Sequence, residues 1–305
     1  MKIPLKPKLI FISMLAVVCF SLQCLNLDPF LFEGEALESY KFDFYGGERE
    51  LDDVIDSLGL IRPEKIHELT LQSGSDSIAA ILLGPQSYFT SEDTVILYLH
   101  GNTKHLDYYW PKIRLLYESG YPVFAIDYRG FGRSSGVATE ENIYEDGHTA
   151  LSYLKNHGNP QIVVIAYSLG SLIGGKITSH NPYESIIALS FIAPIGSIET
   201  LVKDALYFDV PGSYVTTFRG NNMERIKQID IPFLWLHGTE DETLALETNG
   251  LPIWENYTGR EGFAAIIENA AHTDIPSVVG YSKFIEWIRA FISGEGKMVV
   301  DFEQK

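Results

Sequence analysis

Short runs of apolar residues recur along most of the chain, separated by polar and glycine-containing stretches. Eight of these runs are rich in branched and aromatic residues, which predicts β-strands. Several, such as TVILYL at 94–99, have no alternating polar positions and therefore suit strands that are buried on both faces of a parallel sheet. The predicted strands cover residues 66–71, 78–83, 94–99, 123–127, 162–166, 186–192, 233–236 and 263–267.

Between these strands, apolar residues repeat at spacings of three and four, which predicts amphipathic helices. The alternation of strands and helices favours one doubly wound α/β domain over residues 66–305, with a mostly parallel central sheet of about eight strands flanked by helices. Residues 194–230 interrupt the alternation and are expected to form a small cap. The predicted helices cover about 105–119, 140–156, 168–180, 245–257 and 277–293.

The first 24 residues differ from the rest of the chain. A basic stretch containing Lys2, Lys6 and Lys8 precedes an apolar run at 9–22, which is typical of an export signal and short for a membrane span. The Cys24 that follows resembles the acylated cysteine of bacterial lipoproteins. The alternatives are a secreted protein or an uncleaved membrane anchor. We expect an exported, cell-envelope protein, in which residues 25–65 form an arm leading into the domain.

Charge and cysteine content narrow the classes of partner and chemistry. The chain has 23 Lys and Arg against 40 Asp and Glu, a formal net charge of -17, so nucleic acid is not an expected partner. Both cysteines, Cys19 and Cys24, lie in the amino-terminal stretch, which leaves the domain without a disulfide, a cysteine nucleophile or a thiolate metal site. We expect neither a metal site nor a cofactor.

A strand, a sharp turn and a helix meet at Ser168. The segment IVVIAYSLGS at 162–171 matches the nucleophile elbow G-x-S-x-G, with Ala166 at the first glycine position. The small residues Ala166 and Gly170 would let strand and helix approach while Ser168 stands exposed at the turn. A serine that merely caps a helix is the alternative. The chain has no G-K-[ST] phosphate loop and no G-x-G-x-x-G dinucleotide motif there.

A serine nucleophile needs a histidine base that is oriented by a carboxylate, and in elbow-type domains both follow the serine in the chain. His272 lies in a loop after the last predicted strand and is the expected base. His180 at a helix end and His237 inside a strand read as structural residues. The acid is expected in the loop after the strand at 233–236, where Asp241 is preferred over Glu240 and over Glu242.

The oxyanion of an acyl-transfer intermediate needs two backbone N–H donors. One is expected from Leu169, which follows the nucleophile at the start of a helix. The second is expected from Asn102 or Thr103, in the loop after the strand at 94–99, with His100 as a scaffold for that loop.

These motifs together resemble the α/β-hydrolase superfamily, and among its members the small-cap serine hydrolases of the esterase, acylhydrolase and serine-aminopeptidase type. The resemblance rests on HGN at 100–102, DYRGFGRSSG at 127–136, AYSLG at 166–170, HGTEDET at 237–243 and NAAHTD at 269–274. It implies the α/β-hydrolase fold with a small cap. It also implies that DYRGFGRSSG forms a structural loop braced by its aspartate and arginine.

The expected activity is metal-independent hydrolysis of an ester, thioester or amide through an acyl-enzyme on Ser168, with a small acyl compound as substrate. A serine peptidase and a non-catalytic surface protein that binds a ligand are the alternatives. The cap aromatics either line an acyl pocket or form the cap's own core; they are Tyr207, Phe208, Tyr214 and Phe218.

Overall fold

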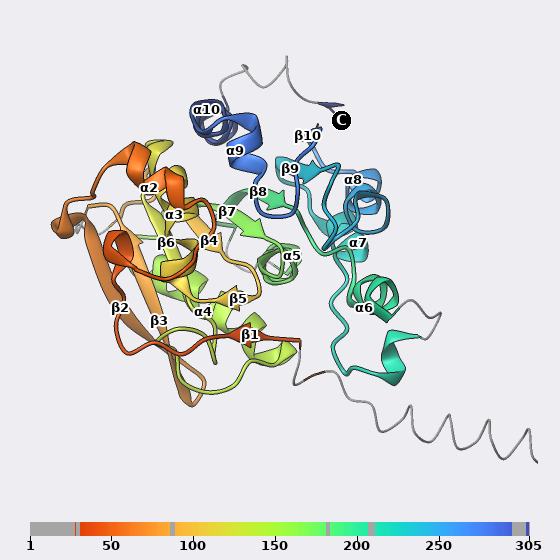
Figure 1. Cartoon of the computed structure of the whole chain (residues 1–305), viewed down its shortest axis with the longest axis horizontal. Coiled ribbons are helices and arrows are strands. Elements are labelled where there is room, and N and C mark those ends of the chain that lie inside the picture. Colours follow the sequence, from red (N-terminus) through yellow and green to blue (C-terminus); the bar gives the residue numbers. More distant parts are fainter. Residues whose placement is uncertain are drawn as a thin grey trace, which may run out of the picture.

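The computed structural model describes residue 28 and residues 31–85, 89–180, 184–206, 211–294 and 303–304. Within these residues a nine-stranded sheet forms the centre of the molecule, in the order β11-β10-β9-β8-β7-β4-β6-β3-β2 (Figure 1). Its strands are β2 (Ile66–Ser73), β3 (Asp76–Leu83), β4 (Thr94–Leu99), β6 (Val123–Ile126), β7 (Gln161–Tyr167), β8 (Ile186–Ile192), β9 (Phe233–Gly238), β10 (Gly262–Ile267) and β11 (Glu303–Gln304).

The strands from β6 through β4, β7, β8 and β9 to β10 are parallel to their neighbours. The pairs β2–β3, β3–β6 and β10–β11 are antiparallel. All eight predicted strands are present, and the ninth is the two-residue β11 at one edge. This mixed, mostly parallel sheet with helices on both faces is the α/β-hydrolase fold, as the sequence predicts.

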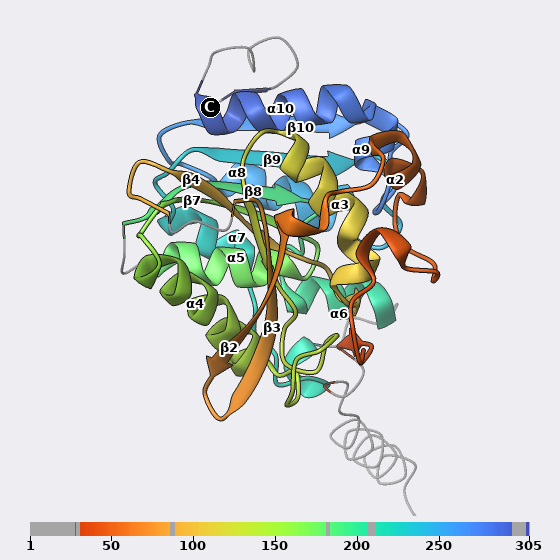
Figure 2. The same ribbon diagram turned by 90° about the vertical axis from the view of Figure 1, so that its left-hand side faces the viewer.

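Helices cover both faces of the sheet because successive strand residues point to opposite sides. In β4, Val95, Leu97 and Leu99 belong to one buried apolar cluster, and Ile96 and Tyr98 belong to another. The first cluster includes residues of α4 (Glu140–Asn156), α5 (Gly170–Ser179) and α8 (Leu251–Asn256), and the second those of α2 (Asp52–Leu58), α3 (Leu106–Glu118) and α10 (Tyr281–Ser293) (Figure 2).

Two predicted helices differ from the observed ones. The segment expected at 277–293 is broken at Gly280, whose φ of 90° ends α9 (Ile275–Val279) before α10 begins. The segment expected at 245–257 begins as a π-helical turn, η6 (Leu246–Gly250), and continues as α8. Apolar spacing is nearly the same across such a break, so the pattern alone does not place it.

The arm at 25–65 is ordered where it is described, and it lies against α3 and the loop after β4. It contains β1 (Glu33–Gly34), the 3₁₀ turns η2 (Phe42–Phe44) and η3 (Pro63–Lys65), and α2. The strand β1 pairs in parallel with β5 (Thr103–Lys104). The carboxylate of Asp107, at the start of α3, accepts hydrogen bonds from the amides of Lys41 and Phe42. The arm therefore borders the loop that was expected to supply an oxyanion donor.

The insert at 194–230 is closed at its base by an isolated antiparallel bridge between Ser197 and Asn221. It contains α6 (Ile198–Leu206), the turn η4 (Gly212–Tyr214), α7 (Asn222–Arg225) and the turn η5 (Ile226–Gln228). Of the four cap aromatics, only the Phe218 side chain lies among the described parts. It is buried and packs on Phe32 at a ring-centroid distance of 5.8 Å.

The predicted export segment at 1–24, including Cys24, lies outside the described residues. Among the residues that are described, no helix has both the length and the apolar character needed to cross a membrane.

Candidate active site

The turn between β7 and α5 places Ser168 at the carboxyl end of the central strand. Ser168 has a φ of 51°, in the left-handed region that non-glycine residues rarely occupy. Its neighbour Gly170 explains the need for a small residue, since a Cβ there would lie 2.1 Å from the carbonyl oxygen of Leu99. The close approach of α5 to β4 therefore forces the tight turn that presents the Ser168 hydroxyl.

Three of the predicted residues converge at the carboxyl ends of the strands. His272 Nε2 lies 3.0 Å from Ser168 Oγ, and His272 Nδ1 lies 2.8 Å from Asp241 Oδ2. Ser168 follows β7, Asp241 follows β9 and His272 follows β10, so the parallel sheet brings together groups far apart in the chain. The His272 side chain is 13% exposed and that of Asp241 is fully buried.

The second oxygen of Asp241 is held by the backbone of its own loop. Oδ1 accepts hydrogen bonds from the amides of Thr243 at 3.0 Å and Leu244 at 2.8 Å. This leaves Oδ2 directed at His272 in a fixed orientation. Glu240 and Glu242 on either side are exposed, so the geometry favours Asp241 among the three carboxylates that the sequence offered.

Among the described residues, neither of the two other histidines that follow Ser168 forms a hydrogen bond with its hydroxyl. His180 is exposed at the end of α5. His237 is buried in β9, where its Nε2 contacts the Leu244 carbonyl oxygen at 2.8 Å and lies 3.4 Å from Asp241 Oδ2. Burial lowers the pKa of His237, which favours its neutral form. A neutral imidazole beside Asp241 leaves the carboxylate charge available to His272.

The expected oxyanion donors lie at the start of α5 and in the loop after β4. Thr103 donates its amide to the Tyr109 hydroxyl at 3.3 Å. The amides of Leu169 and Asn102 donate no hydrogen bond to any other described residue. Asn102 instead uses its carbonyl oxygen to accept from the Glu33 amide of β1 at 3.2 Å, so the arm fixes the orientation of its peptide. The geometry favours the pair Leu169 and Asn102 over Thr103.

His100 is buried beneath this loop. Its ring stacks on Tyr109 and packs at a tilt against Tyr128, and its Nδ1 contacts the Gly101 carbonyl oxygen at 2.7 Å. The Tyr128 hydroxyl donates to the His100 carbonyl oxygen at 2.9 Å. These contacts hold the loop from inside, in keeping with the scaffold role expected from the sequence.

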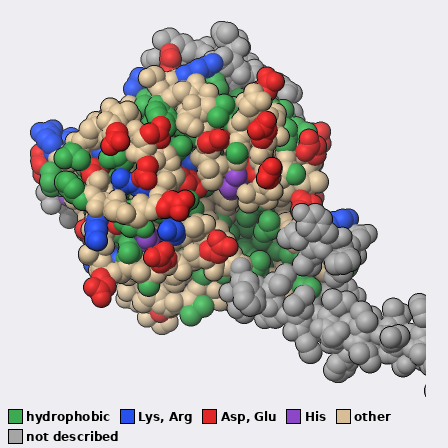
Figure 3. Space-filling view, viewed as in Figure 1, with side chains coloured by type: hydrophobic (Ala, Val, Ile, Leu, Met, Phe, Trp, Pro, Cys, Tyr) green, Lys and Arg blue, Asp and Glu red, His purple; other side chains and the backbone are tan. Residues whose placement is uncertain are grey.

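The molecular surface is hollowed on the face that Figure 3 shows. Hydrophobic side chains line the recess, and several acidic side chains and a histidine lie along part of its margin. Within the described residues, no three His, Cys, Asp or Glu side chains lie close enough together to hold a metal ion.

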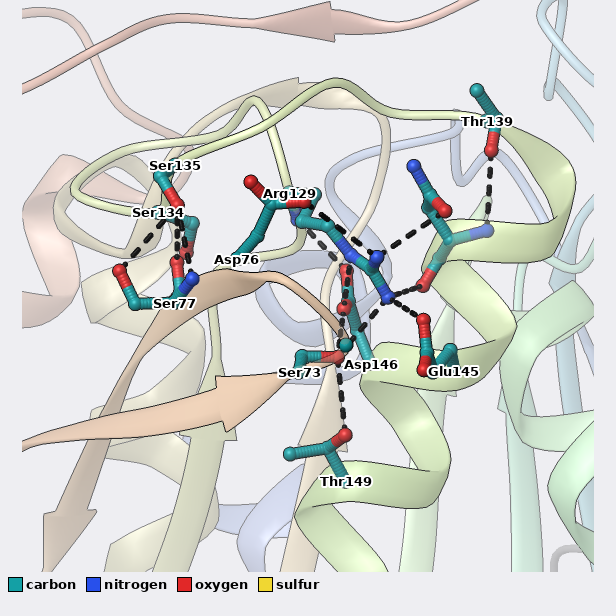
Figure 4. A network of polar contacts seen from close by, with 12 residues as sticks. Ser73, Asp76, Ser77, Arg129, Ser134, Ser135, Thr139, Glu145, Asp146 and Thr149 are labelled. Atoms are coloured by element: carbon teal, nitrogen blue, oxygen red, sulfur yellow. Dashed lines mark hydrogen bonds and ion pairs between the residues drawn. The ribbon is translucent and has the colours of Figure 1, made fainter.

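The segment DYRGFGRSSG forms a loop that is tied to its neighbours by a dense polar network (Figure 4). The Arg129 guanidinium contacts Asp146 through Nε at 2.8 Å, together with Ser73, Asn142 and Glu145. The Asp146 carboxylate also accepts the Arg129 amide at 2.8 Å and the Ser73 hydroxyl at 2.7 Å. The arginine of the motif thereby joins β2, α4 and the loop after β6.

The rest of the segment is joined to the sheet in the same way. Ser134 Oγ donates to the Asp127 carbonyl oxygen at 2.6 Å and accepts from the Ala79 amide of β3 at 2.8 Å. Asp127 accepts from the Tyr40 hydroxyl and, through Oδ1, from the Leu106 amide at 3.0 Å. Both the aspartate and the arginine of the motif brace the loop, as the resemblance implied.

Comparisons with known proteins agree with this architecture. A family model described as serine aminopeptidase, S33, matches residues 90–225. The uncharacterized protein YfhR of Salmonella typhimurium is 27% identical over 175 residues, covering 52% of this chain and 59% of that protein. Protein bem46 of Schizosaccharomyces pombe is 30% identical over 165 residues, covering 52% and 54% respectively. The chain thus spans little more than half the length of these curated relatives.

Two solved structures illustrate the fold. The Pyrococcus furiosus esterase Pf2001 superposes with a TM-score of 0.63 at 19% sequence identity, covering 77% of this chain and 96% of that one. A cold-adapted esterase from an Arctic intertidal metagenomic library superposes with a TM-score of 0.56 at 16% identity, covering 75% and 95%. At such identities the likeness concerns the fold alone.

Proposed function

Because the chain belongs to the α/β-hydrolase superfamily, we propose that it is a serine hydrolase that cleaves a carboxylic ester, thioester or amide through an acyl-enzyme on Ser168. One observation carries the proposal: Ser168 Oγ, the His272 ring and the Asp241 carboxylate form a continuous chain with separations of 3.0 and 2.8 Å. That arrangement is what an activated serine nucleophile requires.

The first half of the reaction forms the acyl-enzyme. Ser168 Oγ attacks the substrate carbonyl carbon while its proton passes to His272 Nε2. Asp241 holds the proton on Nδ1 and stabilises the imidazolium that forms. The amides of Leu169 and Asn102 donate to the developing oxyanion, and the start of α5 adds the positive end of the helix dipole. The leaving group takes the proton from His272 as it departs.

The second half returns the serine. Water gives a proton to His272 Nε2 and attacks the acyl carbonyl, and the carboxylic acid leaves as Ser168 Oγ recovers its proton. Each proton that enters His272 leaves again, so the cycle consumes only substrate and water. The backbone amides serve the second oxyanion as they served the first.

The test uses the change Ser168→Ala with Ser91→Ala as the matched control, because Ser91 is an exposed serine remote from the elbow in sequence. The wild-type protein should hydrolyse short p-nitrophenyl esters and react with a fluorophosphonate probe. The Ser168→Ala variant should lose probe labelling and at least about 10⁴-fold of kcat, while Ser91→Ala retains both. Labelling that persists without Ser168 would reject the assignment.

A folded wild-type protein that is not labelled at all would favour the non-catalytic alternative, in which the domain binds a ligand without turning it over. If the wild-type protein is labelled and active, a panel of p-nitrophenyl esters of graded acyl length measures the depth of its acyl pocket.

Peptidase activity is the second candidate, favoured by the serine aminopeptidase description of the family model that matches residues 90–225. The acidic side chains at the margin of the recess would attract the free amino group of a peptide (Figure 3). Aminoacyl p-nitroanilides, compared with acyl p-nitroanilides that lack the amino group, test this. A kcat/KM for the anilide that exceeds that of an unsubstituted acyl anilide by tenfold would favour a peptidase.

A further inference from the structure

The loop that carries His272 rests on a buried group of charged and aromatic side chains contributed by three separate segments. We propose that Glu50, Lys112 and Tyr167 are positioning residues that hold His272 in line with Ser168. The inference rests on the proposed function, because it concerns the base of the same site.

Two consecutive backbone carbonyls of the loop are held directly. Tyr167 Oη lies 3.1 Å from the His272 carbonyl oxygen, to which it donates. Lys112 Nζ donates to the next carbonyl oxygen, that of Thr273, at 2.8 Å. Tyr167 immediately precedes Ser168, and its ring lies 5.3 Å from the His272 ring. One residue of the elbow thus contacts the base through both its hydroxyl and its ring.

Glu50 completes the group from the arm. Its Oε2 forms an ion pair with Lys112 Nζ at 3.0 Å. Its Oε1 lies 3.3 Å from Tyr167 Oη, so the single hydroxyl proton is shared between this oxygen and the His272 carbonyl oxygen. The side chains of Lys112 and Glu50 are 8% and 6% exposed. Burial, reinforced by the Glu50 carboxylate, raises the pKa of Tyr167 well above its ordinary value, so the hydroxyl keeps the proton it donates.

The Lys112 ammonium has three neighbours in this group. Besides Thr273 and Glu50, the ammonium lies over the Tyr167 ring, 4.5 Å from its centroid. A buried ion pair brings little net stability compared with apolar side chains of the same size. The ion pair does fix the orientation of the Lys112 side chain, because Glu50 compensates the charge of the buried ammonium that donates to the Thr273 carbonyl. The arm is therefore linked to the His272 loop through the Glu50 carboxylate, which contacts Lys112 and Tyr167.

His272 faces charged and titratable groups on several elements. Asp241 and His237 lie on the β9 side, and Ser168 and Tyr167 at the end of β7. On its own loop, the Asp274 carboxylate accepts the Ala271 amide at 2.7 Å. Lys112 and Glu50 lie behind the loop as a pair of zero net charge. Removing either one leaves the opposite charge uncompensated near the imidazole.

The experiment compares Glu50→Gln, Lys112→Met and the double variant with wild type, using p-nitrophenyl acetate. Each single variant should lose about 10- to 100-fold of kcat through misalignment of the base, with KM changed less than about threefold. The acid limb of the kcat/KM profile should move to lower pH in Glu50→Gln, which leaves the ammonium unpaired. It should move to higher pH in Lys112→Met, which leaves the carboxylate unpaired.

The double variant separates charge from position. Its acid limb should return to within about 0.3 pH units of the wild-type midpoint, because no net charge remains, whereas kcat stays low because the Thr273 carbonyl has lost its donor. Lys112→Arg, which keeps a charged donor, should recover part of kcat. If Lys112→Met does not fold, Glu50→Gln still tests the shift of the acid limb to lower pH, and Lys112→Arg tests the positional effect on kcat alone.

Asp43→Asn is the matched control. Asp43 also lies in the arm and forms an equally buried ion pair with α3, through Arg114 at 2.8 Å, but it does not contact the His272 loop. This variant should lose thermal stability while kcat and the acid limb stay at wild-type values. The inference is overturned if Glu50→Gln and Asp43→Asn behave alike in kcat and pH profile.

Fluorophosphonate labelling of the wild type distinguishes a failure of the proposed function from a failure of the positioning role. No labelling of the folded wild-type protein would mean that the proposed function is wrong. Labelling of the wild type together with equal labelling rates in Glu50→Gln would leave the serine hydrolase intact and reject the positioning role.

Discussion

Among the described residues, two polar clusters at the ends of different strands, one around Arg129 and one around Ser168, are bonded very differently. Around Arg129 nearly every donor has a partner: the guanidinium contacts Asp146, Glu145, Ser73 and Asn142 (Figure 4). Around Ser168 the contacts form a linear array of Ser168, His272 and Asp241, called here the Ser168 file. Among the described residues, the Ser168 hydroxyl has only the His272 ring as a side-chain partner. The polar groups around Arg129 are thus largely satisfied by one another, whereas the Ser168 hydroxyl can still contact a substrate.

This difference separates a brace from a reactive site. A fully satisfied buried network gains little from a further ligand and loses much when one member is removed. The Ser168 file leaves the serine oxygen free to meet a substrate carbonyl, and one proton can move between that oxygen and the histidine. We therefore expect changes in the Ser168 file to alter rate without altering stability, and changes around Arg129 to do the opposite.

The largest expected effect is that of Asp241→Asn. An asparagine can still accept the Thr243 and Leu244 amides, but it cannot accept the Nδ1 proton and orient His272 as a carboxylate does. We expect a loss of about 10⁴-fold in kcat, with a midpoint of thermal unfolding close to wild type. Steady-state hydrolysis of p-nitrophenyl acetate and thermal denaturation provide the two measurements.

Glu240→Gln is its control, since Glu240 is the exposed carboxylate next to Asp241. It should retain kcat within about twofold, as expected for a surface change away from the bonded groups. An Asp241→Asn protein that keeps more than a tenth of its activity would show that the file does not work as a unit.

The next effect is on stability, in Arg129→Met. This change leaves the Asp146 carboxylate, whose pKa burial already raises, without its cation. Removing one partner of a buried pair costs about 3–5 kcal/mol in the free energy of unfolding. Urea denaturation measures that loss, while kcat of the folded protein should stay within about threefold of wild type.

Arg133→Met is the matched control from the same loop. Arg133 pairs with Glu68, and both side chains are more than a third exposed. Such a surface pair contributes less than about 1 kcal/mol. Equal destabilisation by the two arginine changes would contradict the distinction between a buried brace and a solvated pair.

The smallest effect concerns buried histidines outside the file. Burial lowers the pKa of His237 and of His105 below 6.5 in the folded protein, so near that pH the unfolded chain binds more protons. The free energy of unfolding therefore falls as the pH falls. From pH 7.5 to 6.0 we expect a loss of up to about 0.8 kcal/mol for each histidine.

Urea denaturation at the two pH values measures this loss. Burial also lowers the pKa of the half-buried His148. His105→Asn should therefore reduce the loss by up to about 0.8 kcal/mol, whereas His180→Asn, a change at an exposed position, should leave it unaltered. A pH dependence that His105→Asn does not reduce would mean that its imidazole takes up a proton in the folded state.

The strands and the Ser168 file could be predicted from local pattern. Branched apolar runs such as 94–99 have few alternatives to a buried strand, and a left-handed serine between a strand and a helix needs small residues at 166 and 170. The chain order of serine, acid and histidine then limited the candidates to a few residues. The choice of Asp241 over Glu240 follows the same local logic, because only one of the adjacent side chains turns inward.

The residues behind His272 could not be predicted. Glu50 is a carboxylate in an arm without periodic pattern, and Lys112 reads as a solvated charge on a helix. Their pairing depends on how the arm lies across α3, which is a long-range packing outcome without a local pattern. The break at Gly280 was missed for a related reason, since a single glycine does not interrupt the apolar spacing on either side.

The left-handed backbone at Ser168 limits which nucleophiles this elbow accepts. A side chain branched at Cβ is poorly tolerated at a φ of 51°, so threonine, although it carries a hydroxyl, is a poor replacement. Unbranched side chains such as cysteine and aspartate meet no such barrier. The turn thus restricts the nucleophile before any substrate is present: the backbone selects for a side chain that is unbranched at Cβ, whichever atom attacks.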